Sequence, residues 1–153
     1  MTKKIISLFL LFSIFCVGEK IEIKSLNMEA DDFKKEVHFN GDVKIKEGKS
    51  RLDSNDAVVY LDAQNKAKEY KATGNVVFYI NKDGNEYKGK AGEVRYFPNT
   101  NIYHLSINAE VEDIINKRVL TGNKMILDMN KKQVKVDGKK NKPIEFIFET
   151  KDK

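Results

Sequence analysis

The chain has 153 residues, of which 41% are hydrophobic and 33% charged, and its formal net charge is +5. This length suits one domain with a proper core and is short for two. Val, Ile, Leu, Phe and Tyr recur throughout, which argues against a disordered chain, and the mild positive charge is no signature of a nucleic-acid-binding protein.

The first eighteen residues form a distinct segment. Two lysines precede the uncharged stretch IISLFLLFSIFCV, and the polar sequence EKIEIK follows Gly18. The apolar stretch is shorter than the about 20 residues of a membrane-spanning helix, and its composition is typical of a secretory signal. We expect residues 1–18 to be a cleaved signal peptide and residues 19–153 to be an exported mature domain. A retained membrane anchor over residues 5–17 is the alternative.

Cys16 is the only cysteine and lies inside this segment. Its acylation is disfavoured because the bulky Phe15 precedes it, where lipoprotein signals have a small residue. A chain cut near Gly18 keeps no cysteine, which excludes disulfides, thiol catalysis and cysteine metal sites. It also loses two lysines and no acid, which leaves a net charge of +3.

Alternating apolar and polar residues dominate the chain from residue 21 onward. In FNGDVKIK, for example, Phe39, Val43 and Ile45 share one face of an extended chain, and Gly41 interrupts the run. The runs are IEIK (21–24), LNMEA (26–30), EVHFNGDVKIK (36–46), LSINAEVE (105–112), QVKVD (133–137) and IEFIFE (144–149). None shows a convincing helical stripe, so we expect a succession of short antiparallel strands.

Segments rich in Asn, Asp, Gly and Lys separate these runs. Asp83-Gly84 and Asp137-Gly138 are typical of two-residue hairpin turns, and we predict a hairpin at each. We interpret the basic segment Lys131 to Lys142 as a solvated strand edge whose lysines oppose aggregation. Contact of this segment with an anionic partner is the alternative.

The chain also contains an approximate internal repeat. FNGDVKI (39–45), ATGNVVF (72–78) and INAEVED (107–113) can be superposed as a bulge followed by a strand, the third unit having lost its glycine. A second strand follows each unit after a turn, at NDAVVYLDAQNK (55–66), GEVRYFPNTN (92–101) and NKMILDMNKK (123–132). The spacing of roughly 30 to 36 residues is typical of stacked repeats.

Two such strands cannot bury one apolar face alone. Repeated units should therefore form two facing sheets or one sheet rolled over. We predict an all-β fold, a sandwich or jelly roll that is elongated, grooved and open at its ends.

The residues of the mature chain resemble a known family. The stretch IEIKSLNMEADDFKKEVHFNGDVKIKEGKSRLDSNDAVVY (21–60) is similar to the start of the LptA/OstA-like periplasmic lipopolysaccharide-transport proteins. The later GNVVFY, YKGKAGEVRYF and VLTGNKMILDMNKK continue the resemblance over essentially the whole mature chain. No single piece is specific, but their order is.

The resemblance implies an elongated, twisted antiparallel β-jelly roll in the periplasm. Lipopolysaccharide would be carried with its lipid A acyl chains in an apolar groove and its sugars in water. The implied partners are an LptC-like inner-membrane protein, an LptD-like outer-membrane protein and further copies stacked head to tail, which together form a bridge between the membranes. No cofactor is implied. The alternatives are a membrane-anchored LptC-like component of the same system and a structural β-sandwich with a packed interior that binds proteins through its strand edges.

Family positions that face the groove, together with the dry face of FNGDVKIK, predict a lipid-binding set. Plain core packing is the alternative for each member. The predicted residues are Ile21, Ile23, Phe39, Val43, Phe78 and Tyr96.

The sequence lacks the residue patterns of an enzyme. His38 and His104 are the only histidines, both lie within strand patterns, and we expect His38 to face solvent. Catalysis needs convergent titratable groups and a metal site needs several ligands. No Gly-x-Ser-x-Gly, phosphate-loop or dinucleotide motif occurs. We therefore predict no catalytic residue and no metal.

Overall fold

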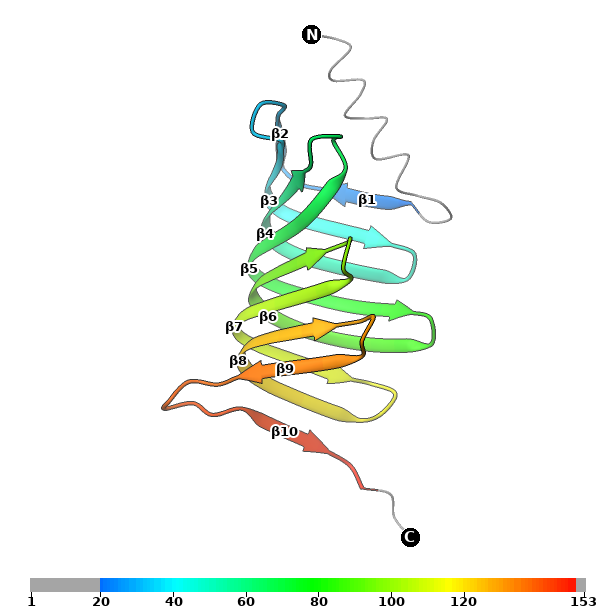
Figure 1. The fold of residues 1–153 in the computed structure, drawn as a ribbon, viewed down its shortest axis with the longest axis vertical. Helices are drawn as coiled ribbons and strands as arrows, with labels where there is room; N and C mark the ends of the chain where they lie inside the picture. Colours follow the sequence, from blue (N-terminus) through cyan, green and yellow to red (C-terminus); the bar gives the residue numbers. More distant parts are fainter. Residues whose placement is uncertain (1–19, 151–153) are drawn as a thin grey trace.

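A computed structural model describes residues 20–150, which form one antiparallel β-sheet (Figure 1). The strands pair in the order β1-β3-β4-β5-β6-β7-β8-β10, with β2 also on β3 and β9 also on β8. Their bounds are β1 Ile21–Lys24, β2 Asn27–Asp31, β3 Glu36–Glu47, β4 Ser50–Leu61, β5 Ala67–Lys82, β6 Asn85–Phe97, β7 Ile102–Asp113, β8 Arg118–Asp128, β9 Gln133–Asp137 and β10 Glu145–Phe148.

The six long strands, β3 to β8, all bend near the middle. The bends follow from bulges on β3, β5 and β7, where the pairing register shifts by one residue. Gly41 and Gly74 have a φ of 82° there, and Ile107 has a φ of 67°. A bulge bends its strand and increases the local twist, so a row of bulges folds the whole sheet.

The row of bulges divides the sheet into two walls. Wall 1 consists of residues 21–24, 43–54, 76–91, 109–122 and 145–148, and wall 2 consists of residues 27–40, 56–73, 93–106 and 124–137. The bends lie at the left of Figure 1, and hairpin turns of both walls lie at the right. The fold is the predicted elongated β-jelly roll, formed by one sheet rolled over rather than by two separate sheets.

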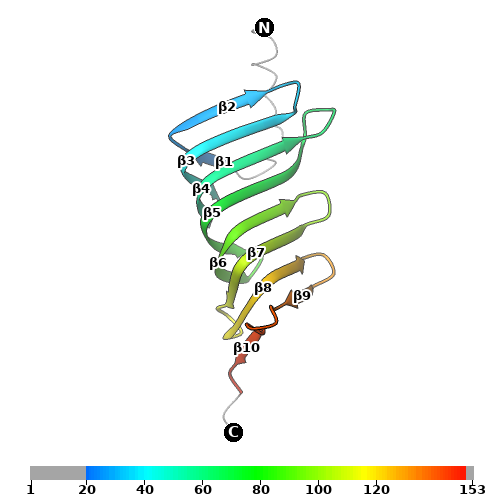
Figure 2. The same ribbon diagram turned by 90° about the vertical axis from the view of Figure 1, so that its left-hand side faces the viewer.

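The rolled sheet is open at both ends. β1 and β2 lie at one end, β9 and β10 lie at the other, and within residues 20–150 each of these strands pairs with a single neighbour (Figure 2). No helix in this part of the chain is long and apolar enough to span a membrane. The predicted signal peptide, residues 1–18, and Cys16 lie outside the described residues.

Alternation on each half-strand produces a core between the walls. On β4, for example, Ala57, Val59 and Leu61 are buried, whereas the intervening side chains face outward. The buried residues form two clusters, one over β3 to β5 and one over β5 to β8. Burying an aliphatic or aromatic side chain of this kind contributes about 1.5–3 kcal/mol.

The structure confirms the repeat but corrects its third unit. Gly41, Gly74 and Ile107 occupy equivalent bulge positions and are spaced 33 residues apart. The third unit is therefore 105–111, two residues earlier than predicted. The sequence signal was lost because an isoleucine holds the left-handed backbone position that glycine normally fills.

One of the two predicted hairpin turns is also wrong. Asp83-Gly84 joins β5 to β6, as predicted, with both residues at positive φ. Asp137-Gly138 is no hairpin turn, because the chain turns three residues later, at Lys140-Asn141, where the flanking Lys139 and Lys142 exchange backbone hydrogen bonds of 2.8 and 3.0 Å. Glycine is required at position 138 by crowding, since a Cβ there would lie 2.8 Å from the backbone nitrogen of Ile144.

Candidate functional site

The inward faces of the two walls enclose a cavity of about 490 Å³. Its lining extends from β1 to the end of β8 and reaches the hairpin turns, at Asp83 on wall 1 and at Pro98 on wall 2. Ligand-binding pockets typically have volumes of about 300–1,000 Å³ and mainly apolar walls. The groove between the walls is therefore the candidate site.

The wall 1 side of the groove is built from one row of register partners. Ile23 lies opposite Ile45, which lies opposite Leu52, which in turn lies opposite Phe78. The next position in the row is Gly89, and a Cβ there would lie 2.4 Å from Cζ of Phe78. The phenyl ring therefore lies over the glycine backbone, which makes the row continuous and apolar.

The wall 2 side carries a row of tyrosines. The ring centroids of Tyr70 and Tyr96 are 6.1 Å apart, and those of Tyr96 and Tyr103 are stacked at 4.4 Å. Burial raises the pKa of both Tyr96 and Tyr103, and the carboxylate of Glu47 raises each further. Both hydroxyls thus stay protonated at neutral pH, so this wall is apolar with a few neutral hydrogen-bonding groups.

The structure brings five of the six predicted lipid-binding residues together. Residues from β1, β3, β5 and β6 line the groove as predicted, namely Ile21, Ile23, Phe39, Phe78 and Tyr96. Val43 shares the inward face but is fully buried beside the bulge of β3, and it does not line the cavity. Contact of these residues with lipid stays a prediction.

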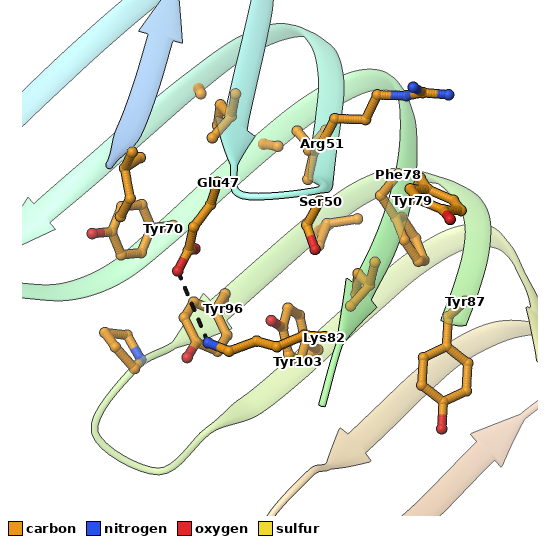
Figure 3. Close-up of a pocket in the computed structure, with 18 of the residues that line it drawn as sticks. Glu47, Ser50, Arg51, Tyr70, Phe78, Tyr79, Lys82, Tyr87, Tyr96 and Tyr103 are labelled. Carbon is orange, nitrogen blue, oxygen red and sulfur yellow. Dashed lines mark ion pairs between the residues drawn. The ribbon is translucent and has the colours of Figure 1, made fainter. Parts of the chain in front are cut away.

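A pair of charged residues in the groove was missed by the sequence analysis. Glu47 and Lys82 line the cavity at the turn ends of β3 and β5, and their side chains form an ion pair of 3.9 Å (Figure 3). The signal was present, because Glu47 continues the inward positions 43 and 45, and Lys82 continues the inward positions 76, 78 and 80. At these turn ends the inward side chains of wall 1 are polar.

A second polar group lies on the same rim. The Asp113 side chain accepts hydrogen bonds from Arg118 at 2.6 Å and from the side chain and backbone of Asn116 at 2.9 and 3.2 Å. Burial alone would raise the pKa of Asp113, but these hydrogen bonds outweigh it and hold the pKa below its usual value. This cluster fixes the turn between β7 and β8.

The histidines take part in no cluster of metal ligands. His38 faces outward, as predicted, and its ring nitrogen lies 2.7 Å from a carboxylate oxygen of Glu36. The ring of His104 lies on the outer face, 5.2 Å from that of Phe97. Between residues 20 and 150 there is no group of three or more potential metal ligands from His, Cys, Asp and Glu.

The fold and the groove define a class of protein, an open single-sheet β-jelly roll with an apolar channel between its walls. A family model described as "LptA/(LptD N-terminal domain) LPS transport protein" matches residues 22–133. The chain therefore belongs to this family, which confirms the LptA/OstA-like resemblance. The family consists of lipopolysaccharide-transport proteins and not of enzymes, so the general role of the chain is in lipopolysaccharide transport.

A solved structure shows the same fold. LptH, the LptA-homologous periplasmic component of the lipopolysaccharide transport device of Pseudomonas aeruginosa, matches with a TM-score of 0.73 and 18% sequence identity. The match covers 85% of this chain and 95% of the LptH chain. No curated protein sequence matches the chain.

Proposed function

We propose that the protein is a periplasmic lipopolysaccharide carrier that binds lipid A acyl chains in the groove. The observation that carries this proposal is the cavity of about 490 Å³ between apolar walls. A packed structural sandwich, the alternative of a different class, would have its inward residues in mutual contact and no cavity of ligand size. The periplasmic location of the homologous LptH supports the compartment.

The chemistry of the groove suits a cargo that must move. Each methylene removed from water contributes about 0.8 kcal/mol, so several acyl chains can be held without any directed bond. One aliphatic wall position resembles the next, so sliding along the groove changes the free energy little. The sugars would remain in water at the mouth, where the hairpin turns lie.

Site-specific photo-crosslinking in cells tests the proposal. A photoreactive amino acid at Ile23 or Phe78, both inward, should capture lipopolysaccharide. The same probe at Glu22 or Val77, the outward neighbours, should capture little. Absence of capture from both inward positions in folded protein would refute acyl binding in the groove.

The two open ends support assembly into a bridge. Each wall contains eight antiparallel strands, so its first and last strands run in opposite directions. β9 and β10 of one copy can therefore continue antiparallel onto β2 and β1 of the next, which extends both walls and the groove. Large apolar side chains are exposed at both ends, with Met28 48% and Phe148 56% exposed. LptC-like and LptD-like jelly rolls at the two membranes could add to the same edges.

The state of the N-terminus separates this carrier from the membrane-anchored, LptC-like alternative. N-terminal sequencing of protein isolated from cells should find a start near Glu19. Retention of residues 5–17 would instead assign the chain to the anchored component.

A further inference from the structure

The rim of wall 1 carries a cation that faces into the groove. Lys82 is the last residue of β5 and continues the inward positions of Phe78 and Ile80, so its aliphatic stem extends the inward face of β5 and its ammonium group reaches the mouth. Figure 3 shows Lys82 and Glu47 pointing toward each other beside Tyr96 and Tyr103. A positive charge thus lies where the apolar groove meets water.

The ion pair that holds this cation is easily broken. The side chains of Lys82 and Glu47 are 61% and 42% exposed, and their charged atoms are 3.9 Å apart. Exposed pairs of this kind contribute only about 0–1 kcal/mol to stability. Another anion could therefore replace Glu47 as the partner of Lys82 with little loss.

We propose that Lys82 binds the phosphate group of an amphiphile whose acyl chains lie in the groove, and that Glu47 is the partner which this phosphate displaces. The inference rests on the proposed function and adds to it a recognition element for the headgroup. A phosphate gains a charge-assisted hydrogen bond from the ammonium group. The carboxylates of Glu47 and Asp83 on the same rim oppose an added anion, so the phosphate must replace Glu47 rather than join the pair.

The tyrosine row assists this exchange. The hydroxyl of Tyr103 lies within the electrostatic reach of Glu47 and remains protonated, so it can donate a hydrogen bond to a displaced carboxylate or to the phosphate. The hydroxyl of Tyr96 already donates to Oδ1 of Asn101 at 3.3 Å and would have to exchange that partner. A lipid with the same acyl chains and no phosphate would leave the ion pair intact. The site therefore discriminates headgroups, whereas the groove retains chains of many kinds.

The test compares the binding of lipid A and of fully dephosphorylated lipid A to the purified full chain. The wild type should prefer the phosphorylated form by about ten-fold, the factor expected for one charge-assisted hydrogen bond. Lys82→Gln should abolish the preference while binding of the dephosphorylated form persists. Glu47→Gln should increase the preference, because the competing carboxylate is gone.

The outer face of wall 1 offers matched controls. Lys88 and Glu112 form a similar pair of 3.4 Å with side-chain exposures of 60% and 35%, and neither lines the groove. Lys88→Gln and Glu112→Gln should therefore leave the preference unchanged. A wild type without preference, or equal losses in Lys82→Gln and Lys88→Gln, would overturn the assignment of Lys82.

Two further outcomes distinguish a failure of the proposed function from a failure of the headgroup assignment. If neither form of lipid A binds to folded wild-type protein, the proposed function itself is refuted. If inorganic phosphate alone protects Lys82 from amine modification as well as lipid A does, the site takes free phosphate, and the headgroup assignment is overturned.

Discussion

At the scale of single residues, the groove depends on which side chains of the alternating strands face inward. Alternation places Phe39 on the inward face, and the family resemblance adds Ile21, Ile23, Phe78 and Tyr96, so this part of the lining could be predicted from the sequence. Alternation could not separate lining from core, because Val43 shares the parity but lies against the bulge. The same parity also points Glu47 and Lys82 inward, although their charge suggests solvent.

Glycine at the bulge of β5 is a residue that the fold requires. Gly74 has a φ of 82°, and a Cβ there would lie 2.5 Å from the side chain of Asn55. Gly84, in a hairpin turn, has a φ of 78° and open space around the missing Cβ. Gly84→Ala should lower the free energy of unfolding by about 1–2 kcal/mol through backbone strain alone.

Gly74→Ala adds a steric clash to the same strain. It should lower the free energy of unfolding by about 2–4 kcal/mol, which urea denaturation measures directly. Equal losses of stability in Gly74→Ala and Gly84→Ala would show that the limited space around residue 74 adds no steric cost at the bulge.

The rim carboxyl Asp113 should make stability depend on pH. Its pKa is lower in the folded protein than in the unfolded chain, so its contribution is complete above the unfolded value of about 3.9. The contribution is lost as the pH falls through the lower, folded pKa. Melting temperatures of wild type and Asp113→Asn between pH 7 and pH 2 should therefore converge on acidification.

Arg118 provides the control for this prediction. Arg118→Gln removes a donor to the Asp113 carboxylate and should raise its folded pKa. The acid-induced loss of stability should then be smaller than in the wild type and should be complete at a higher pH. An unchanged difference between wild type and Asp113→Asn at all pH values would contradict this role of Asp113.

At the scale of elements, the bulges determine the shape of each strand. The glycines of two units reveal their bulges in the sequence, whereas the third bulge, at Ile107, could not be located because a β-branched residue rarely adopts positive φ. Local turn preference also misplaced the turn predicted at Asp137-Gly138, because the chain turns between Lys139 and Lys142. Gly138 instead lies in a crowded place, where a Cβ would lie 2.8 Å from the backbone nitrogen of Ile144.

The terminal strands of wall 2 carry complementary charges on their outward faces. Glu29 of β2 lies beside the outward His38, and Lys135 of β9 lies beside the outward Ile126. If β9 of one copy pairs with β2 of the next, opposite charges across the new edge stabilise the contact. Glu29→Lys and Lys135→Glu should each weaken concentration-dependent oligomers in sedimentation experiments.

The charge exchange also has an internal control. Either single variant places like charges across every junction with its own copies, whereas the double variant restores opposite charges at every junction and should regain oligomers. In an equal mixture of the two single variants, each contact between unlike variants also pairs opposite charges, so mixed oligomers should form. A strictly monomeric wild type at high concentration would contradict the assembly itself.

At the scale of the whole molecule, one sheet rolled over a row of bulges keeps two apolar faces apart. The sequence could not decide between two facing sheets and one rolled sheet, because each half-strand alternates in the same way in both arrangements. The structure resolves this through pairing, since β3 to β8 each continue from one wall into the other. The resulting groove is the feature on which transport would depend.

Native mass spectrometry of the purified protein after incubation with lipopolysaccharide tests this account most directly. We expect a complex with one lipopolysaccharide molecule per chain. Free fatty acids should compete with lipopolysaccharide for the groove and reduce the amount of this complex. Ile45→Glu places a charge in the apolar row and should abolish the lipopolysaccharide complex, whereas Lys46→Glu on the outward face should leave the complex intact. Folded wild-type protein that binds no lipopolysaccharide, or that binds it equally well with Ile45→Glu, would contradict the account.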